Sequence, residues 1–320
     1  MSVGAGLEAL VIGRLHADLY PEQIGVPLED VRTFERFVGG FAGNVGVGLA
    51  RLGARTGVVS GVGDDGHGRF IRRFLEDEGV ETRWIRTDPS ARTPLTFCEI
   101  RPPADFPLLA YRPGDAPDWQ LTPGDVPADA ARDVPLLFVS GTGFAVEPSR
   151  STTLGVMAGR GPAGGDRATV LDLDWRAGYW QRPDDYGPLV RQAAHLADVV
   201  IGSDEEFRVA GLSPTEITGV DDRKVFVKHG PNGASLLTRG RTIDVPGLVV
   251  DVVNGLGAGD AFAAAVGWGI LRNLDDGEVL RLANVAGAIV AERVECSGAM
   301  PTESELATRA EAFRVARSGR

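Results

Sequence analysis

Short apolar runs alternate along most of the chain with longer stretches in which apolar residues recur at helical spacing. The apolar runs have the length of strands and are rich in valine, isoleucine and leucine, which is typical of strands buried on both faces. They lie at residues 7–15, 56–63, 134–143, 168–175 and 197–207. The helical stretches lie at residues 41–54 and 66–80, after Glu147 and up to His195. This alternation predicts an α/β fold with a mostly parallel central sheet covered by helices on both faces.

The segment Val249–Leu271 organises the rest of this pattern. Its β-branched residues at 249–253 predict a strand, residues 254–259 predict a glycine-rich turn, and the small and apolar residues that follow predict a helix. Glycines let another molecule approach the backbone closely, and the first N–H groups of a helix have no partner within it. Such a turn can bind an anion such as a phosphate.

Asp260 lies in the first turn of this predicted helix and has two interpretations. A carboxylate there can satisfy free N–H groups, which stabilises a helix start by about 1 kcal/mol. Beside a bound phosphate, the same carboxylate can act as a general base. We interpret Asp260 as the base and keep the helix cap as the alternative.

Two parts of the chain depart from the alternation and predict a small β lid. Strand-like pieces lie there at residues 31–40, 93–101 and 106–112. Residues 89–135 hold half of the 20 prolines, which excludes long helices, yet they keep apolar and aromatic residues that a disordered linker would lack. We therefore expect lid segments at approximately residues 14–40 and 92–115.

A dinucleotide-binding motif is an alternative at residues 61–66, where the glycine spacing fits and Asp88 follows at the distance of a ribose-binding acid. The adjacent acids Asp64 and Asp65 would repel a pyrophosphate, however, and this unit does not contain the first strand of the fold. We therefore expect no NAD site here.

Composition limits the classes of function. The 320 residues have a formal net charge of −11 and a pI near 4.9, and such a chain lacks the basic surface that nucleic acids and anionic membranes require. The apolar run at residues 261–271 is too short to span a bilayer and the N-terminus lacks a basic start, so we expect a cytoplasmic protein. Cys98 and Cys296 have no metal-ligand spacing with any histidine, and we interpret both as buried thiols.

Several motifs together resemble the ribokinase-like, or phosphofructokinase-B, sugar kinases over nearly the whole chain. They are GLGAGDAF with the run before it, GGFAGNVGVGLARLG near the N-terminus, the hairpin VKHGPNGASLL and the closing SGAMPT. The resemblance implies one domain over residues 1–320, an α/β/α sandwich with a small β lid. It also implies a phosphotransferase that uses ATP and Mg²⁺ to phosphorylate a primary sugar hydroxyl, and a homodimer through the lid, as is common in the family.

The resemblance also implies roles for individual residues. The implied catalytic groups are the base Asp260 and an anion hole made by the backbone N–H groups of Gly257, Ala258 and Gly259. The implied sugar-binding residues are Asp18, Gly39, Gly40 and Asn44. The implied nucleotide-side residues are Ser203, Lys228, Gly230, Gly233 and Asn284, and Glu206 is implied at the Mg²⁺ and phosphate.

The chain departs from the family pattern at two positions. Ser203 stands where the family's Asn-x-x-Glu motif has Asn, which leaves its part in Mg²⁺ and phosphate binding open. Asn254 stands where potassium-dependent members have Asp, so activation by K⁺ is also open.

Within the family, residues 13–40 and 93–118 most resemble the members that phosphorylate 5-dehydro-2-deoxygluconate in inositol catabolism. This resemblance implies a sugar acid, and an arginine can bind its carboxylate with two parallel hydrogen bonds. Arg112 and Arg176 are the candidates and Arg14 is a weaker one, although Arg112 can instead be solvated and Arg176 can merely neutralise Asp172 or Asp174, which lie at a strand's end.

Two alternatives stay open. Another kinase of the same family would act on 2-keto-3-deoxygluconate, fructose or a nucleoside. A non-catalytic sugar or nucleotide sensor would have kept the fold and lost turnover. The presence of Asp260 argues against a sensor, and Ser203 argues weakly for one.

Overall fold

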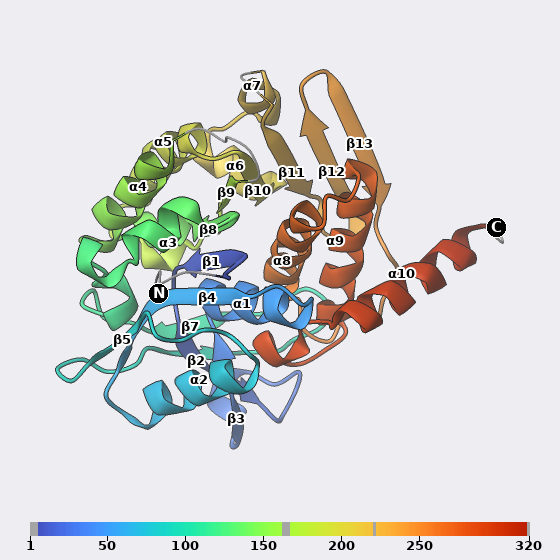
Figure 1. Cartoon of the computed structure of the whole chain (residues 1–320). Coiled ribbons are helices and arrows are strands. Elements are labelled where there is room, and N and C mark those ends of the chain that lie inside the picture. Colours follow the sequence, from blue (N-terminus) through green and yellow to red (C-terminus); the bar gives the residue numbers. More distant parts are fainter. Residues whose placement is uncertain (1–5, 162–166, 220–221, 319–320) are drawn as a thin grey trace.

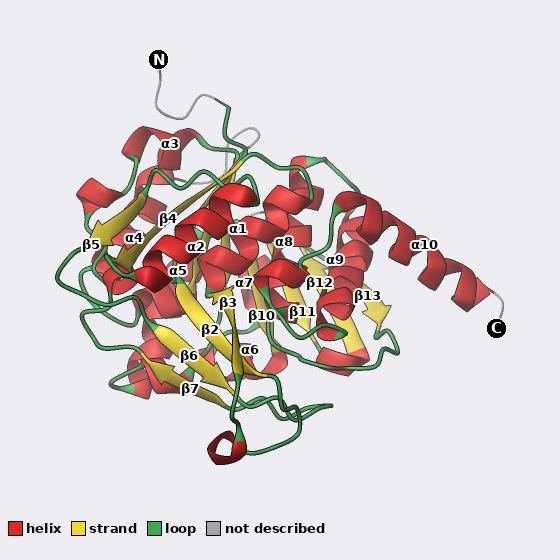
Figure 2. Cartoon of the chain, turned by 90° about the horizontal axis from the view of Figure 1, so that it is seen from below, coloured by secondary structure: helices red, strands yellow, loops and turns green. Residues whose placement is uncertain are grey.

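The computed structural model describes residues 6–161, 167–219 and 222–318. In these residues the chain forms a large sheet and a small sheet (Figure 1 and Figure 2). The large sheet has the strand order β13-β12-β11-β10-β9-β8-β1-β4-β5. Its strands are β1 (Ala9–Ile12), β4 (Thr56–Gly63), β5 (Ile85–Asp88), β8 (Leu136–Ser140), β9 (Ala168–Asp172), β10 (Val199–Ser203), β11 (Lys224–Lys228), β12 (Gly233–Thr238) and β13 (Arg241–Pro246).

Neighbouring strands of the large sheet are parallel from β5 to β11, as the alternation of strands and helices predicts. β1 lies between β4 and β8, and all of its residues are buried. The pairs β11–β12 and β12–β13 are antiparallel, and short turns join these strands. The predicted α/β fold class is therefore confirmed.

Helices cover both faces of the large sheet. Alternate residues of each strand point to opposite faces, and both sets are apolar, so each face packs against helices. Ala9 and Val11 of β1 belong to one apolar core, and Leu10 and Ile12 belong to the other. The first core includes residues of α1 (Phe41–Arg51), α2 (Gly66–Asp77), α8 (Ala258–Leu271), α9 (Asp276–Ala291) and α10 (Glu303–Ser318). The second includes residues of α3 (Ala128–Asp133), α4 (Ser149–Arg160), α5 (Tyr186–Leu196), α6 (Asp204–Ala210) and α7 (Pro214–Thr218). These layers form an α/β/α sandwich.

The small sheet lies below the large sheet in Figure 1 and has the strand order β3-β2-β6-β7. Its strands are β2 (His16–Pro21), β3 (Phe34–Gly39), β6 (Leu95–Cys98) and β7 (Leu108–Tyr111). All four come from the two predicted lid segments. That this sheet closes over a substrate stays a prediction.

The predicted strand at residues 249–253 is wrong. These residues form no regular element, and Val249 is 97% exposed. The edge of the large sheet is instead β13, which pairs with β12 along its whole length and which the sequence analysis did not predict separately. β-branched residues favour strands only where a neighbouring strand and a buried face are available, and β13 already occupies that edge.

The glycine motif at residues 61–66 does not leave a free anion-binding turn. The Asp65 side chain accepts hydrogen bonds from the backbone N–H groups of His67 and Gly68, so the start of α2 is already capped. Asp88 forms an ion pair with Arg86 at 2.5 Å. The absence of a dinucleotide site here stays a prediction.

Other sequence predictions about the fold have mixed outcomes. Asp18, predicted at the end of a core strand, lies within β2 of the small sheet. Apart from Gly161, the predicted loop at residues 161–165 lies outside the described residues. Among the helices that the structure describes, none has both the length and the apolar character needed to cross a membrane.

Candidate active site

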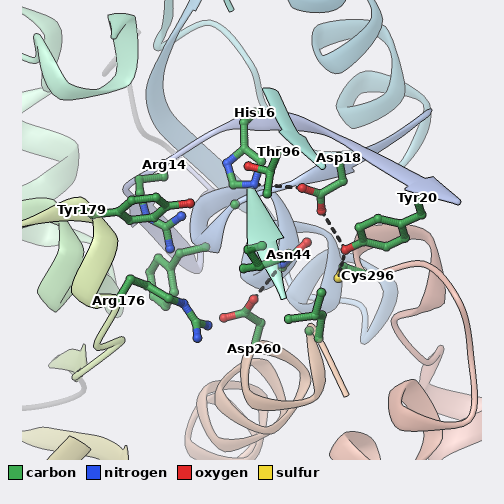
Figure 3. Close-up of a pocket in the computed structure, with 15 residues that line it drawn as sticks. Arg14, His16, Asp18, Tyr20, Asn44, Thr96, Arg176, Tyr179, Asp260 and Cys296 are labelled. Atoms are coloured by element: carbon green, nitrogen blue, oxygen red, sulfur yellow. Dashed lines mark hydrogen bonds and ion pairs between the residues drawn. The ribbon is translucent and has the colours of Figure 1, made fainter. Parts of the chain in front are cut away.

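One cavity lies where the start of α8, the start of α1 and the inner face of the small sheet meet (Figure 3). Its volume is about 410 Å³, which includes space open to solvent. Among the residues predicted from the sequence, its lining contains Arg14, Asp18, Gly40, Asn44, Arg176, Gly257 and Asp260. The rest of the lining is Leu256 of the predicted glycine turn, together with residues that were not predicted in a site: His16, Tyr20, Phe41, Thr96, Leu108, Tyr179 and Cys296.

Asp260 lies in the first turn of α8, and its carboxylate points into the cavity (Figure 3). Asn44 of α1 donates a hydrogen bond from Nδ2 to Asp260 Oδ2 at 2.7 Å, and Ser297 donates to Asn44 Oδ1 at 2.6 Å. Burial and the nearby charge of Asp174 raise the pKa of Asp260 to about 6, although the Asn44 hydrogen bond lowers it. A carboxylate with such a pKa can accept a proton near neutral pH.

The glycine turn before α8 is held by side chains around it. Gly257 has a φ of 81°, and a Cβ at this position would lie 3.0 Å from Cys296 Sγ, so the position requires glycine. Asn254 is fully buried, accepts a hydrogen bond from Leu256 N at 3.0 Å and donates one to the carbonyl of Val294 at 2.6 Å. An aspartate could not make the second bond, which is a structural reason for Asn254 in this chain.

Two arginines line the cavity wall beside Asp260, and both form ion pairs with the buried carboxylate of Asp174. Arg14 Nη2 contacts Asp174 Oδ2 at 2.8 Å, and Arg176 Nε contacts Asp174 Oδ1 at 3.2 Å. Burial alone would raise the pKa of Asp174, but the two guanidinium groups lower it to about 2. Since Arg176 is paired through Nε, its terminal nitrogens face the space in front of Asp260 (Figure 3). The side chain of Arg176 is 45% exposed.

A second charged cluster lies beside the glycine turn, at the ends of β9 and β11. Lys228 Nζ is 3.4 Å from Asp172 Oδ2 and 3.7 Å from Glu206 Oε2. A Cβ built on Gly259 would lie 3.3 Å from Lys228 Nζ, so the ammonium group lies next to the first turn of α8. Burial alone would lower the pKa of Lys228, but these carboxylates raise it, which keeps the ammonium charged. Burial raises the pKa of Asp172 to about 7, although Lys228 lowers it.

Glu206 and Ser203 form a reciprocal cap at the start of α6. Ser203 Oγ accepts from Glu206 N at 3.2 Å, and Glu206 Oε2 accepts from Ser203 N at 2.6 Å. Glu206 Oε1 accepts a third bond, from Trp175 N at 3.1 Å. The capping pattern Ser-x-x-Glu was visible in the sequence and gives Ser203 a structural role where the family has Asn.

The donor set fits Mg²⁺ only together with phosphate. Among the described residues there is no group of three or more histidine, cysteine, aspartate or glutamate side chains that could hold a metal ion. Mg²⁺ in phosphate-handling sites keeps several waters and uses one or two carboxylates besides the phosphates. Glu206, whose oxygens keep further lone pairs, and Asp172 are the carboxylates available near Lys228.

The predicted nucleotide-side residues lie outside the lining of this cavity. Gly230 and Gly233 form the turn between β11 and β12, and both have positive φ values. Asn284 of α9 donates a hydrogen bond to the Pro246 carbonyl at the end of β13 at 3.0 Å. These residues and Lys228 therefore belong to one region of the fold, in which α9 packs against β12 and β13.

The small sheet contributes Asp18 to the opposite wall. His16 Nε2 is 3.0 Å from Asp18 Oδ1, and the Tyr20 hydroxyl donates to Asp18 Oδ2 at 2.9 Å. Cys296 Sγ is 2.9 Å from the Tyr20 hydroxyl, so this buried thiol is part of the network. Gly39 does not line the cavity, but a Cβ there would overlap the Asp18 carboxylate, which explains the glycine.

Arg112, a predicted sugar-binding residue, lies behind this wall and does not line the cavity. Its side chain is 1% exposed, and Nη1 contacts both Asp118 oxygens at 2.5 and 2.6 Å. Its Nη2 is 3.0 Å from His16 Nδ1. Contact between Arg112 and a substrate stays a prediction, and the geometry supports Arg176 better.

The cavity therefore combines a base with raised pKa, a helix start with free N–H groups and two arginines, and the ammonium group of Lys228 lies next to the same helix start. This set can position a hydroxyl for attack on a phosphoryl group and stabilise the charge that develops.

Comparisons with known proteins agree with this chemistry. The sequence profile of pfkB family carbohydrate kinases matches residues 7–303. The chain is 33% identical to the 5-dehydro-2-deoxygluconokinase of Geobacillus kaustophilus, over 94% of this chain and 92% of that protein. It is similar in structure to an uncharacterized sugar kinase from Pyrococcus horikoshii in complex with ATP, with a TM-score of 0.83, 29% identity and coverage of 95% of this chain and 99% of that one. It is also similar to a fructokinase from Vibrio cholerae in a fructose, ADP and calcium ion bound form, with a TM-score of 0.82, 26% identity and coverage of 95% and 99%.

Proposed function

The chain belongs to the pfkB family of carbohydrate kinases, and we propose that it phosphorylates the primary hydroxyl of 5-dehydro-2-deoxygluconate, with ATP as the donor. Relatives that are about one third identical are named 5-dehydro-2-deoxygluconokinase, and the similar structure with bound ATP supports ATP as the donor. The product would be the 6-phosphate of inositol catabolism.

One observation carries the choice of a sugar acid. The guanidinium group of Arg176 faces the space in front of Asp260, where a neutral sugar would need no cation (Figure 3). An arginine fork binds a carboxylate with two parallel hydrogen bonds. A substrate with its reacting hydroxyl at Asp260 and its carboxylate at Arg176 uses both groups.

In this mechanism the chain's own residues position the reactants. Asp260 removes the hydroxyl proton at its carboxylate, and Asn44 holds that carboxylate in place. The N–H groups of residues 257–259 and the ammonium group of Lys228 lie where negative charge develops on the transferred phosphoryl group. When bound, Mg²⁺ supplies further neutralisation of phosphate charge, and Glu206 and Asp172 are the residues that would hold it through water.

A substrate panel tests this function. The purified protein is mixed with ATP and one sugar at a time, and ADP formation is measured for 5-dehydro-2-deoxygluconate, 2-keto-3-deoxygluconate, fructose and adenosine. We expect the largest kcat/KM with the first compound. If another sugar gives a higher kcat/KM, the proposed substrate is wrong but the protein is still a kinase. Sugar binding without ADP formation indicates a sensor.

The pH dependence of the rate follows from Asp260. Because only the ionised carboxylate can accept a proton, we expect kcat/KM for the sugar to fall as the pH is lowered through about 6, the raised pKa of Asp260. Steady-state kinetics across this range measure it. Asn44→Ala removes a hydrogen bond that favours the carboxylate, so its acid limb should move to higher pH. A wild-type profile that stays flat well below pH 6 would contradict the assignment.

The outer face of the small sheet carries exposed apolar side chains. Residues paired across the strands share a face, and this face carries Phe34, Phe97, Leu109 and Tyr111. Leu109 is 46% exposed and Tyr111 is 59% exposed. β7 is also an edge strand, and unpaired edges are sites of strand association. We propose a homodimer through this face.

Sedimentation velocity tests the homodimer. Tyr111→Lys places a charge in the apolar face and should convert the dimer to a monomer at micromolar concentration. Val249→Lys is the matched control, because Val249 is also an exposed hydrophobic residue but lies outside the small sheet. A wild-type monomer, or a Tyr111→Lys dimer as tight as the wild type, argues against this interface.

A further inference from the structure

Thr96 of β6 has a hydroxyl group without a hydrogen-bond partner. The residue is 2% exposed and lines the cavity, and its Oγ1 is buried without a hydrogen bond to any of the described residues. Native proteins rarely leave a buried polar group in this state, because its bonds to water are lost and not replaced. A bound molecule in the cavity would supply the missing partner.

Asp18 is the direct neighbour of Thr96. The two residues are register partners in the parallel pair of β2 and β6, so their side chains lie side by side on the face that borders the cavity (Figure 3). The Thr96 hydroxyl nevertheless makes no hydrogen bond to this carboxylate. It is therefore free to turn toward a ligand.

The hydrogen bonds around Asp18 all donate toward its carboxylate. Arginine has no acceptor, so Arg112 Nη2 donates to His16 Nδ1, at 3.0 Å. The remaining ring nitrogen, Nε2, then carries the proton and donates to Asp18 Oδ1. Burial lowers the pKa of His16; Asp18 raises it, but the charges of Arg112 and Arg14 oppose Asp18, and the net lowering favours the neutral ring. Tyr20 donates to the other oxygen of Asp18.

This arrangement fixes Asp18 from two sides and leaves its remaining lone pairs to accept a hydroxyl of the ligand. The Asp118 carboxylate holds Arg112, so the chain of bonds ends on a buried ion pair. Asp18 thus offers acceptors only, and beside it Thr96 offers a donor that is not yet used. Two adjacent oxygen atoms of a sugar, one a hydroxyl and the other a hydroxyl or a carbonyl, match this pair.

We propose that Thr96 binds the sugar directly and determines specificity together with Asp18, a role that rests on the proposed function. The Thr96 hydroxyl donates to a sugar oxygen adjacent to the hydroxyl that donates to Asp18. A sugar that lacks the oxygen that accepts from Thr96 leaves the Thr96 hydroxyl unpaired in the closed site. Sites that hydrogen-bond a substrate oxygen discriminate strongly against analogues that lack it.

Thr96→Val tests the role, because valine keeps the shape and removes the hydroxyl. We expect kcat/KM for 5-dehydro-2-deoxygluconate to fall by about ten- to a hundredfold while KM for ATP stays near the wild-type value. Thr96→Ser keeps the hydroxyl and should recover most of the lost kcat/KM. The melting temperature of ligand-free Thr96→Val should not fall, because the hydroxyl has no internal partner to lose.

Thr56→Val is the matched control. Thr56 is buried in β4 and donates to the Ala54 carbonyl at 3.0 Å, so this variant should melt at a lower temperature and keep wild-type kinetics. The role of Thr96 is overturned if the wild type phosphorylates the sugar acid and Thr96→Val does so equally well, or if Thr96→Val and Thr96→Ser lose the same activity. A wild-type protein that phosphorylates no sugar overturns the proposed function instead.

Discussion

Asp260→Asn is expected to lower kcat by about 10²–10⁴-fold or more, because the amide cannot take the proton of the attacking hydroxyl. Asparagine has nearly the same shape, and its side-chain oxygen can still accept the hydrogen bond from Asn44 Nδ2. Binding of sugar and ATP should therefore change little. Single-turnover rates and equilibrium binding separate these two effects.

Asp275→Asn is the control for this substitution. Asp275 caps the neighbouring helix α9 through the N–H groups of Gly277 and Glu278, and asparagine caps helices about as well as aspartate. This variant should keep the wild-type kcat. If folded Asp260→Asn turns over at the wild-type rate, Asp260 is only a helix-start residue, which is the alternative that its position in the sequence left open.

Arg176→Lys is expected to lower kcat/KM for the sugar acid by about ten- to a hundredfold, with KM for ATP near its original value. Lysine keeps the charge but cannot form two parallel hydrogen bonds with a carboxylate. The activity on fructose should fall much less, so the preference for the acid shrinks. Steady-state kinetics with both sugars measure this preference.

Arg112→Lys provides the comparison. Arg112 is buried and contacts Asp118 and His16, and His16 in turn contacts Asp18. We therefore expect this substitution to lower kcat/KM for the sugar acid and for fructose to the same extent, because Asp18 does not bind the carboxylate of the acid. If Arg176→Lys and Arg112→Lys both keep the wild-type preference for the acid, another group binds the carboxylate or the substrate is not an acid.

Predictions from contiguous sequence were the most successful. The glycine turn and the helix start that presents Asp260 form one segment, so local spacing alone predicts them. The four strands of the small sheet also come from the segments that broke the alternation. By contrast, residues 249–253 have strand composition without a neighbouring strand, and composition cannot show which segment occupies a sheet edge.

The partners of buried charges could not be predicted from the sequence. From the sequence, Arg112 could be a solvated lid residue. Its contact with His16, which lies 96 positions earlier in the chain, is visible only in the fold. Cys296 and Tyr20 are 276 positions apart, and only tertiary contact reveals their bond. Thr96 gives no sequence signal, because its significance lies in a missing hydrogen bond. The capping box of Ser203 and Glu206 is the exception, since its spacing is local.

The bond between Asn44 and Asp260 joins residues that are 216 positions apart, and it has a consequence for synthesis of the protein on the ribosome. Both sheets and α1 precede α8 in the chain, so Asp18 and Thr96 are translated long before the glycine turn at the start of α8 and Asp260. Ala264 of α8 fills the space beside Gly48 of α1, where a Cβ would come within 2.7 Å. Since a domain generally folds as a unit, a nascent chain would complete this cavity, and with it the ability to consume ATP, only when its last helices have been synthesised.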